Sequence, residues 1–109
     1  MIHDYRLLLR PFPDDGRLAL PFDLLDGLSH TVRRRLSGSI WDSTSHPPFQ
    51  IINFSSYLDA AIVHQAIEGA LADQRVAWIL GHDNRQEFHG WSAVESLEWY
   101  RLFRTGTRD

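Results

Sequence analysis

The sequence predicts one α+β domain, in which a mainly antiparallel sheet packs against two or three helices. Three observations indicate this: short β-rich runs bounded by turn residues, two segments with apolar residues at helical spacing, and a length that suits one domain. The 109 residues are 43% hydrophobic and 12% aromatic, a composition that allows one hydrophobic core. The expected order of elements over residues 1–109 is β-β-α-β-α-β-β-α.

A Pro-Asp-Asp-Gly turn divides the first expected hairpin. The turn occupies residues 13–16, between two apolar runs. Proline restricts φ, aspartate hydrogen-bonds its own backbone, and Gly16 tolerates a positive φ, so the segment favours a reversal of the chain. We therefore expect paired strands over about 4–11 and 17–20.

The first helix is predicted over 22–36, directly after Pro21. Apolar residues recur there at spacings of three and four, as on one face of a helix. Residues 37–48 are rich in serine and end in a pair of prolines, which favours a long loop. Trp41 stands inside this loop, where its ring either packs onto the core or is exposed as a contact residue.

An uncharged β-rich run over 49–54 predicts a central strand, and a second helix follows it. Ser56 and Asp59 have the spacing of a capping box, so the helix is expected to begin there and to reach about residue 73. Its apolar residues, which include Ile62 and Leu71, fill an arc of roughly 220° on a helical wheel. Such a helix should be covered on more than one side.

A second hairpin is predicted near the C-terminus, with strands over 76–80 and 86–91 and a turn over 81–85. The segment 93–103 is ambiguous. A capping-box pattern at Ser92 favours a helix, whereas its aromatic content would suit a strand, and we expect the helix. The last residues, 104–109, should fray.

Composition excludes several kinds of chemistry. The chain has no cysteine, so disulfides, thiolate metal sites and a cysteine nucleophile are impossible, and all eleven basic residues are arginine, which removes lysine chemistry. The net charge of −3 argues against nucleic acid as the main ligand. No segment is long and apolar enough for a membrane span or a signal peptide, so we expect a cytoplasmic protein. No metal site or cofactor is expected.

The residues most suited to catalysis fall in the second hairpin. His82 and Asp83 would lie at its tip, while Glu87 and His89 would share one face of the returning strand. A histidine beside a carboxylate can act as a general base, and two histidines with a carboxylate can bind a metal. Because the spacing matches no metal motif and suits an ordinary turn, His82, Asp83 and His89 are weak catalytic candidates.

Two other charged groups have plainer explanations. Arg33-Arg34-Arg35 would lie near the end of the first helix, where basic residues interact favourably with the helix dipole. His64 and Glu68 are one turn apart on the second helix and suit a solvated pair.

Aromatic residues are more numerous than a core of this size needs. The sequence has thirteen, of which four are tryptophan. The segment 88–103 combines aromatic and acidic residues, as an interface for a basic partner would. The expected partner-binding residues are Trp91, Trp99, Tyr100, Glu95 and Glu98, together with Trp41.

These observations favour a small protein-binding module of the inhibitor, immunity or adaptor kind. The expected partner is another protein, and the acidic residues favour a basic one; a homodimer is an alternative. The alternative is a small enzyme or ligand-binding domain that uses His82, Asp83 and His89. A concave pocket around those side chains would favour the enzyme, and a flat aromatic patch the binding module.

Overall fold

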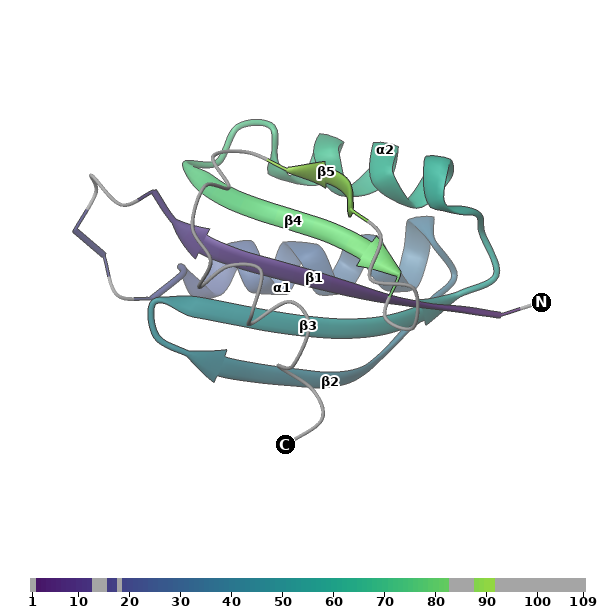
Figure 1. Cartoon of the computed structure of the whole chain (residues 1–109), viewed down its shortest axis with the longest axis horizontal. Helices are drawn as coiled ribbons and strands as arrows, with labels where there is room; N and C mark the ends of the chain where they lie inside the picture. The colour runs from purple at the N-terminus through teal and green to yellow at the C-terminus, as the bar shows by residue number, and fades with distance from the viewer. Residues whose placement is uncertain (1, 13–15, 18, 83–87, 92–109) are drawn as a thin grey trace.

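The computed structural model describes residues 2–12, 16–17, 19–82 and 88–91. Within these ranges the chain forms five strands, two α-helices and one π-helical turn (Figure 1). In chain order they are β1 (His3–Pro11), α1 (Phe22–His30), the π-helical turn η2 (Thr31–Arg35), β2 (Ser39–His46), β3 (Phe49–Ser56), α2 (Ala60–Leu71), β4 (Val76–His82) and β5 (Phe88–Trp91).

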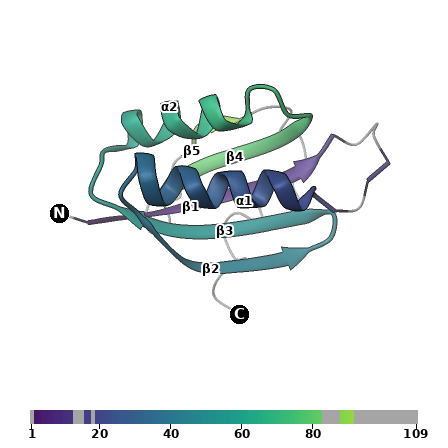
Figure 2. The ribbon, with the colours of Figure 1, turned by 180° about the vertical axis from the view of Figure 1, so that it is seen from behind.

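The five strands form one antiparallel sheet in the order β2-β3-β1-β4-β5. Both helices lie on the same face of this sheet, as Figure 2 shows from behind. The first six elements, with η2 as the continuation of α1, follow the β-α-β-β-α-β pattern of the split βαβ motif, and β5 adds a strand beside β4. The predicted α+β class with a helix-covered antiparallel sheet is confirmed.

The first predicted hairpin is wrong. Strand β1 pairs with β3 on one side and with β4 on the other, so both of its edges are occupied by distant segments. Residues 16, 17, 19 and 20 lie outside any strand. Gly16 does adopt the positive φ expected of the turn, at 69°. Residues 13–15 of the expected turn lie outside the described residues, and after Gly16 the chain leads into α1 and not into a second strand.

The loop predicted over 37–48 is also wrong, because most of it is strand β2. This strand pairs antiparallel with β3 from Ser39 opposite Ser55 to His46 opposite Phe49. The Pro47-Pro48 peptide bond is cis and lies in the short turn between the two strands. Backbone pairing with an apolar strand therefore overrides the weak strand preference of this serine-rich segment.

The first helical segment agrees with the prediction over 22–36, except that its last turn is π-helical. Leu24, Leu28, Val32 and Leu36 are buried on one side of α1 and η2. After Leu36 the chain turns through Ser37, whose φ is 49°. The N–H of Gly38 then donates to the carbonyl of Val32 at 2.8 Å, which ends the helix.

The second helix is confirmed, but it begins later than the capping-box pattern indicated. Asp59 caps the helix, because its Oδ1 accepts a hydrogen bond from the backbone N–H of Ile62 at 3.1 Å. The hydroxyl of Ser56 has a different role. It accepts from the N–H of Leu58 at 3.1 Å and donates to the carbonyl of Leu36 at 2.7 Å, which ties the end of β3 to the end of the first helical segment.

Helix α2 buries a single face, so the expectation that it is covered on more than one side is not confirmed. Val63, Ala66, Ile67 and Leu71 pack into the core, whereas Ile62 is 47% exposed. The apolar arc on the helical wheel is therefore wider than the contact that the sheet provides. Part of the arc consists of small residues that expose little apolar area.

The central strands bury apolar side chains on both faces of the sheet. Leu7 and Leu9 belong to the core beneath the helices, whereas Leu8 belongs to a second cluster on the opposite face. The other buried members of that cluster are Phe49, Ile51, Ala77 and Ile79. Double burial explains why the apolar runs 7–9 of β1 and 76–80 of β4 are continuous and do not alternate with polar residues.

The hairpin predicted near the C-terminus is confirmed as β4 and β5, which pair antiparallel with Ile79 opposite Trp91. Strand β3 was expected to be central. It is an interior strand, but the middle position belongs to β1. The segment 93–103, expected as a helix, lies outside the described residues.

Candidate protein-interaction edge

Strand β2 forms one edge of the sheet. Among the described strands it has β3 as its one neighbour, and it lies at the border of the ribbon in Figure 1. An edge strand presents a row of backbone N–H and C=O groups on its outer side, where another strand can add. The eight residues of β2 include one charged side chain by formal count, that of Asp42, and no proline. The position and composition of β2 therefore suit pairing with a further strand.

Trp41 is the large apolar side chain of this edge. It lies where the pairing of β2 with β3 shifts register between Ile40 and Asp42, which marks a β-bulge. Its side chain is 49% exposed, so it is neither a plug in the core nor fully solvated. Of the two positions left open for Trp41, the structure shows the exposed one, and its role as a contact residue stays a prediction.

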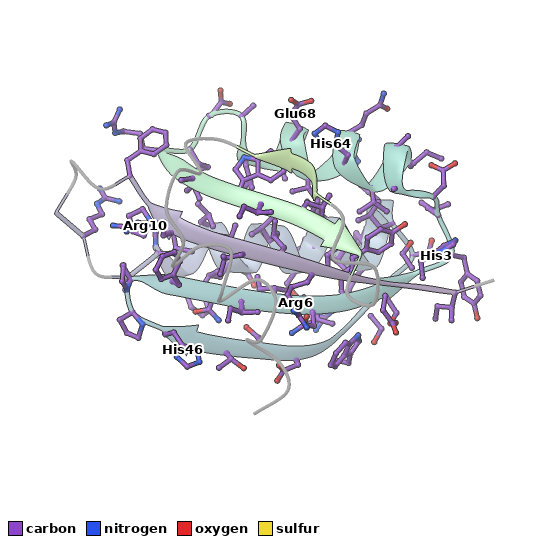
Figure 3. All side chains as sticks on the ribbon, viewed as in Figure 1. His3, Arg6, Arg10, His46, His64 and Glu68 are labelled. Atoms are coloured by element: carbon purple, nitrogen blue, oxygen red, sulfur yellow. The ribbon has the colours of Figure 1, made fainter. Side chains whose placement is uncertain are left out.

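A polar row across the sheet holds Asp42 in position. Asp42 lies opposite Asn53 on β3, and Asn53 lies opposite Arg6 on β1. Asn53 Nδ2 donates to Asp42 Oδ2 at 3.3 Å, and Arg6 Nε donates to Asn53 Oδ1 at 3.1 Å. Arg6 and Asn53 are both buried, and Figure 3 shows Arg6 within the sheet.

Thr44 completes this arrangement, because its hydroxyl donates to the same Asp42 oxygen at 3.3 Å. Every buried side-chain N or O atom of the described residues has a hydrogen-bond partner. The row therefore anchors β2 to the sheet through satisfied polar groups, and it fixes the side chain of Asp42 before any partner binds.

A second exposed apolar spot lies where β1 begins. His3 pairs with Ser56, so Ile2 and Tyr57 flank the same end of the sheet. Both are exposed, with 52% and 68% of their surface accessible. Phe22 is the remaining large exposed aromatic residue among those described, and it is the first residue of α1.

The catalytic candidates are placed only in part. His82 is the last residue of β4 and lies opposite Tyr5 in the backbone pairing, while His89 lies in the adjacent strand β5. Asp83 and Glu87 lie outside the described residues. The backbone of the hairpin thus brings two of the four candidates into neighbouring strands.

The expected partner-binding surface is likewise placed in part. Trp91 ends β5, whereas Trp99, Tyr100, Glu95 and Glu98 lie outside the described residues. Their role as a binding surface stays a prediction.

His64 and Glu68 differ in their surroundings. Both lie on α2, as Figure 3 shows, but the ring of His64 packs against Trp78 with 5.9 Å between centroids. Glu68 is exposed. Arg33, Arg34 and Arg35 are also exposed, on η2. Across the described part of the chain, no group of three histidine and acidic side chains could hold a metal ion.

The edge position of β2 was not predicted from the sequence. Two signals pointed to it. Ile40, Trp41 and Thr44 are residues that favour strands, and the two prolines that follow His46 are typical of a turn between strands. The many serines concealed both signals, because serine is more common in loops.

No helix in the described part of the chain is long and apolar enough to cross a membrane. No family model and no curated protein matches the chain significantly. Its fold is similar to that of the 30S ribosomal protein S6 from Thermotoga maritima, known from a crystal structure. The match has a TM-score of 0.57 and 11% sequence identity, and it covers 75% of this chain and 88% of that one. At this identity the similarity concerns the fold.

Proposed function

We propose that this domain is a small protein-binding module of the inhibitor, immunity or adaptor kind, and that β2 contributes a strand-pairing edge to its interface. The observation that carries the proposal is the half-exposed side chain of Trp41 on an edge strand with little charge. Tryptophan is enriched among the residues that dominate protein interfaces.

Strand addition suits this edge. A partner segment that lies along β2 would form main-chain hydrogen bonds, and side-chain contacts would then determine which segment binds. Natural edge strands usually prevent such pairing with charged side chains, prolines or bulges. In β2 the bulge lies at Trp41, and the strand continues regularly from Asp42 to His46.

The contribution of Trp41 can be estimated from its exposure. A tryptophan side chain buries up to about 250 Å² in total, so covering the exposed half removes roughly 100 Å² from water. At about 25 cal/mol per Å² this is worth about 2.5 kcal/mol, the range of an interface hot spot.

The acidic and aromatic surface over 88–103 is a second part of the proposal. A net charge of −3 suits a basic protein partner better than nucleic acid. Alanine at Trp99 or Tyr100 should weaken binding by about 2 kcal/mol or more, and charge reversal at Glu95 or Glu98 should mainly slow association. The cytoplasmic location also stays a prediction.

The alternative function, a small enzyme or ligand-binding domain, is supported by one observation. The pairing of β4 with β5 places His82 and His89 on adjacent strands. This reading predicts that His82→Ala or His89→Ala abolishes an activity, whereas changes to the edge strand leave that activity intact.

The proposal can be tested by comparing the parent chain with one tryptophan variant and one phenylalanine variant. The full chain, Trp41→Ala and Phe22→Ala are each used to capture proteins from the native host, and the captured proteins are quantified by mass spectrometry. Phe22 is the matched control, because it is an exposed aromatic residue on another element. Circular dichroism confirms that all three chains are folded.

We expect at least one protein that the parent and Phe22→Ala both capture and that Trp41→Ala loses by about tenfold or more. If the folded Trp41→Ala variant captures the same proteins in the same amounts as the parent, β2 is not the binding edge.

A further inference from the structure

We propose that a second copy of this chain occupies the β2 edge, with the two β2 strands antiparallel and Thr44 on the two-fold axis. This inference rests on the proposed function, because it names the partner of the same edge. Two copies joined in this way would form one continuous sheet through their β2 strands.

The sequence of β2 is self-complementary about Thr44. In an antiparallel pair with a two-fold axis at Thr44, residues at equal distances on either side of it become opposite neighbours. Ser43 then faces the partner's Ser45, and Asp42 faces the partner's His46. One step further, the bulged Trp41 lies nearest to the partner's Pro47, which follows the end of β2. A single register therefore pairs hydroxyl with hydroxyl, acid with imidazole, and indole with proline.

The acid and imidazole pair forms twice in this arrangement. His46 is exposed at the end of β2, as Figure 3 shows. Asp42 is already held by the hydrogen bonds from Asn53 and Thr44, so little side-chain freedom is lost when it meets an imidazole. Oppositely charged or hydrogen-bonded cross-strand pairs stabilise a sheet by about 0.2–1 kcal/mol each.

The apolar contact uses the residues that β2 leaves exposed. Trp41 is 49% exposed, and Pro47 is exposed in the cis turn. Both are three residues from Thr44: Trp41 precedes it in β2, and Pro47 lies one residue beyond the end of the strand. Because the two-fold axis relates the two copies, each copy covers the tryptophan side chain of the other.

Moving the two-fold axis to Ser43 or Ser45, the nearest registers that pair the same backbone groups, loses this complementarity. Asp42 would then lie opposite the partner's Thr44 or Pro48, and Trp41 opposite the partner's Ser45 or Phe49, so both acid–imidazole pairs disappear. Strand register is specified by such side-chain pairs. Two eight-residue strands make a small interface, so the dimer should dissociate on dilution.

Sedimentation equilibrium of the full chain over about 1–500 µM tests the proposal. The variant His46→Asp places two like-charged pairs in the interface, because each new carboxylate faces the partner's Asp42. His30→Asp is the matched control, since His30 is also exposed but lies on α1. The double variant Asp42→Asn with His46→Asp removes the repulsion while it keeps an acceptor oxygen for Asn53 and Thr44.

We expect the parent and His30→Asp to form dimers with dissociation constants within about twofold of each other. His46→Asp should raise the dissociation constant by about tenfold or more, and the double variant should recover part of that loss. An unchanged dimer in His46→Asp would overturn the proposed register. If the parent chain stays monomeric, a second copy of this chain is not the occupant of the β2 edge. If capture of a foreign protein still depends on Trp41 in that case, the proposed function stands.

Discussion

The two isoleucines of α2 allow a sharp test of how this helix packs. Ile67 is fully buried, whereas Ile62 is 47% exposed on the same helix. Each isoleucine-to-alanine change removes three carbon atoms and changes helix propensity by the same small amount. The difference between the two variants therefore reports burial alone.

The magnitudes follow from the structure. At about 0.8 kcal/mol for each buried carbon, Ile67→Ala loses about 2.4 kcal/mol of transfer free energy, and the remaining cavity raises the cost into the range of about 2–5 kcal/mol. Ile62→Ala loses about half of the transfer term and leaves no closed cavity. Since alanine also favours the helix by a few tenths of a kcal/mol, the net cost at Ile62 should stay below about 1 kcal/mol.

Urea denaturation followed by tryptophan fluorescence and circular dichroism measures both free energies of unfolding. Trp78 is buried in the core, so its emission reports the transition. We expect Ile67→Ala to be less stable than Ile62→Ala by at least about 1.5 kcal/mol, with Leu71→Ala close to Ile67→Ala. Equal losses at Ile62 and Ile67 would show that both sides of α2 are covered and that the single-face packing described above is wrong.

The remaining predictions concern close backbone contacts and caps. Gly38→Ala should destabilise the fold by about 1–3 kcal/mol, because the added Cβ would lie 2.5 Å from the carbonyl oxygen of Ser55; Gly27→Ala, where nothing lies within 4 Å, should instead stabilise it by about 0.5–1 kcal/mol, and a loss at Gly27 equal to that at Gly38 would contradict the contact. Ser56→Ala should cost about 1–3 kcal/mol in thermal or urea unfolding, since one buried and one part-buried hydrogen bond disappear. Asp59→Ala should cost about 1 kcal/mol by the same measurement, and no change would mean that Asp59 is not the cap.

The sequence predicted those elements whose own side chains show the apolar pattern of a strand or a helix. The apolar runs of β1, β3 and β4 predict strands. The helical spacing of apolar residues in α1 and α2 predicts helices and the face that each one buries. These patterns are local, so they can be recognised without knowing the partner of each element. The α+β class followed from them directly.

The errors occurred where pairing with a distant segment decides the structure. Residues 18–20 are apolar in sequence, but both edges of β1 are taken by β3 and β4, so no place beside β1 remained for a neighbouring strand. Strand β2 shows the converse, because its serines form a strand only beside β3. The cap of α2 moved to Asp59 because Ser56 is used to bind the carbonyl of Leu36.

The candidate site was predicted less well than the fold. Trp41 was identified as a possible contact residue from its aromatic side chain alone. Its position on an edge strand could not be read from the sequence, because whether a strand lies at an edge depends on the order of strands in the sheet.

The central position of β1 has a consequence for synthesis on the ribosome. Among the described strands β1 leaves the ribosome first, and its partner Ile79 on β4 lies seventy-one positions after Leu8. At about 5–20 residues per second, the apolar run of β1 waits roughly 4–14 seconds for its second neighbour. During that interval the run Leu7-Leu8-Leu9 can pair with β3 at most, so one edge of the future central strand stays open. The nascent chain is thus most prone to aggregation before β4 is made, and a slow stretch of translation between α2 and β4 would lengthen that period.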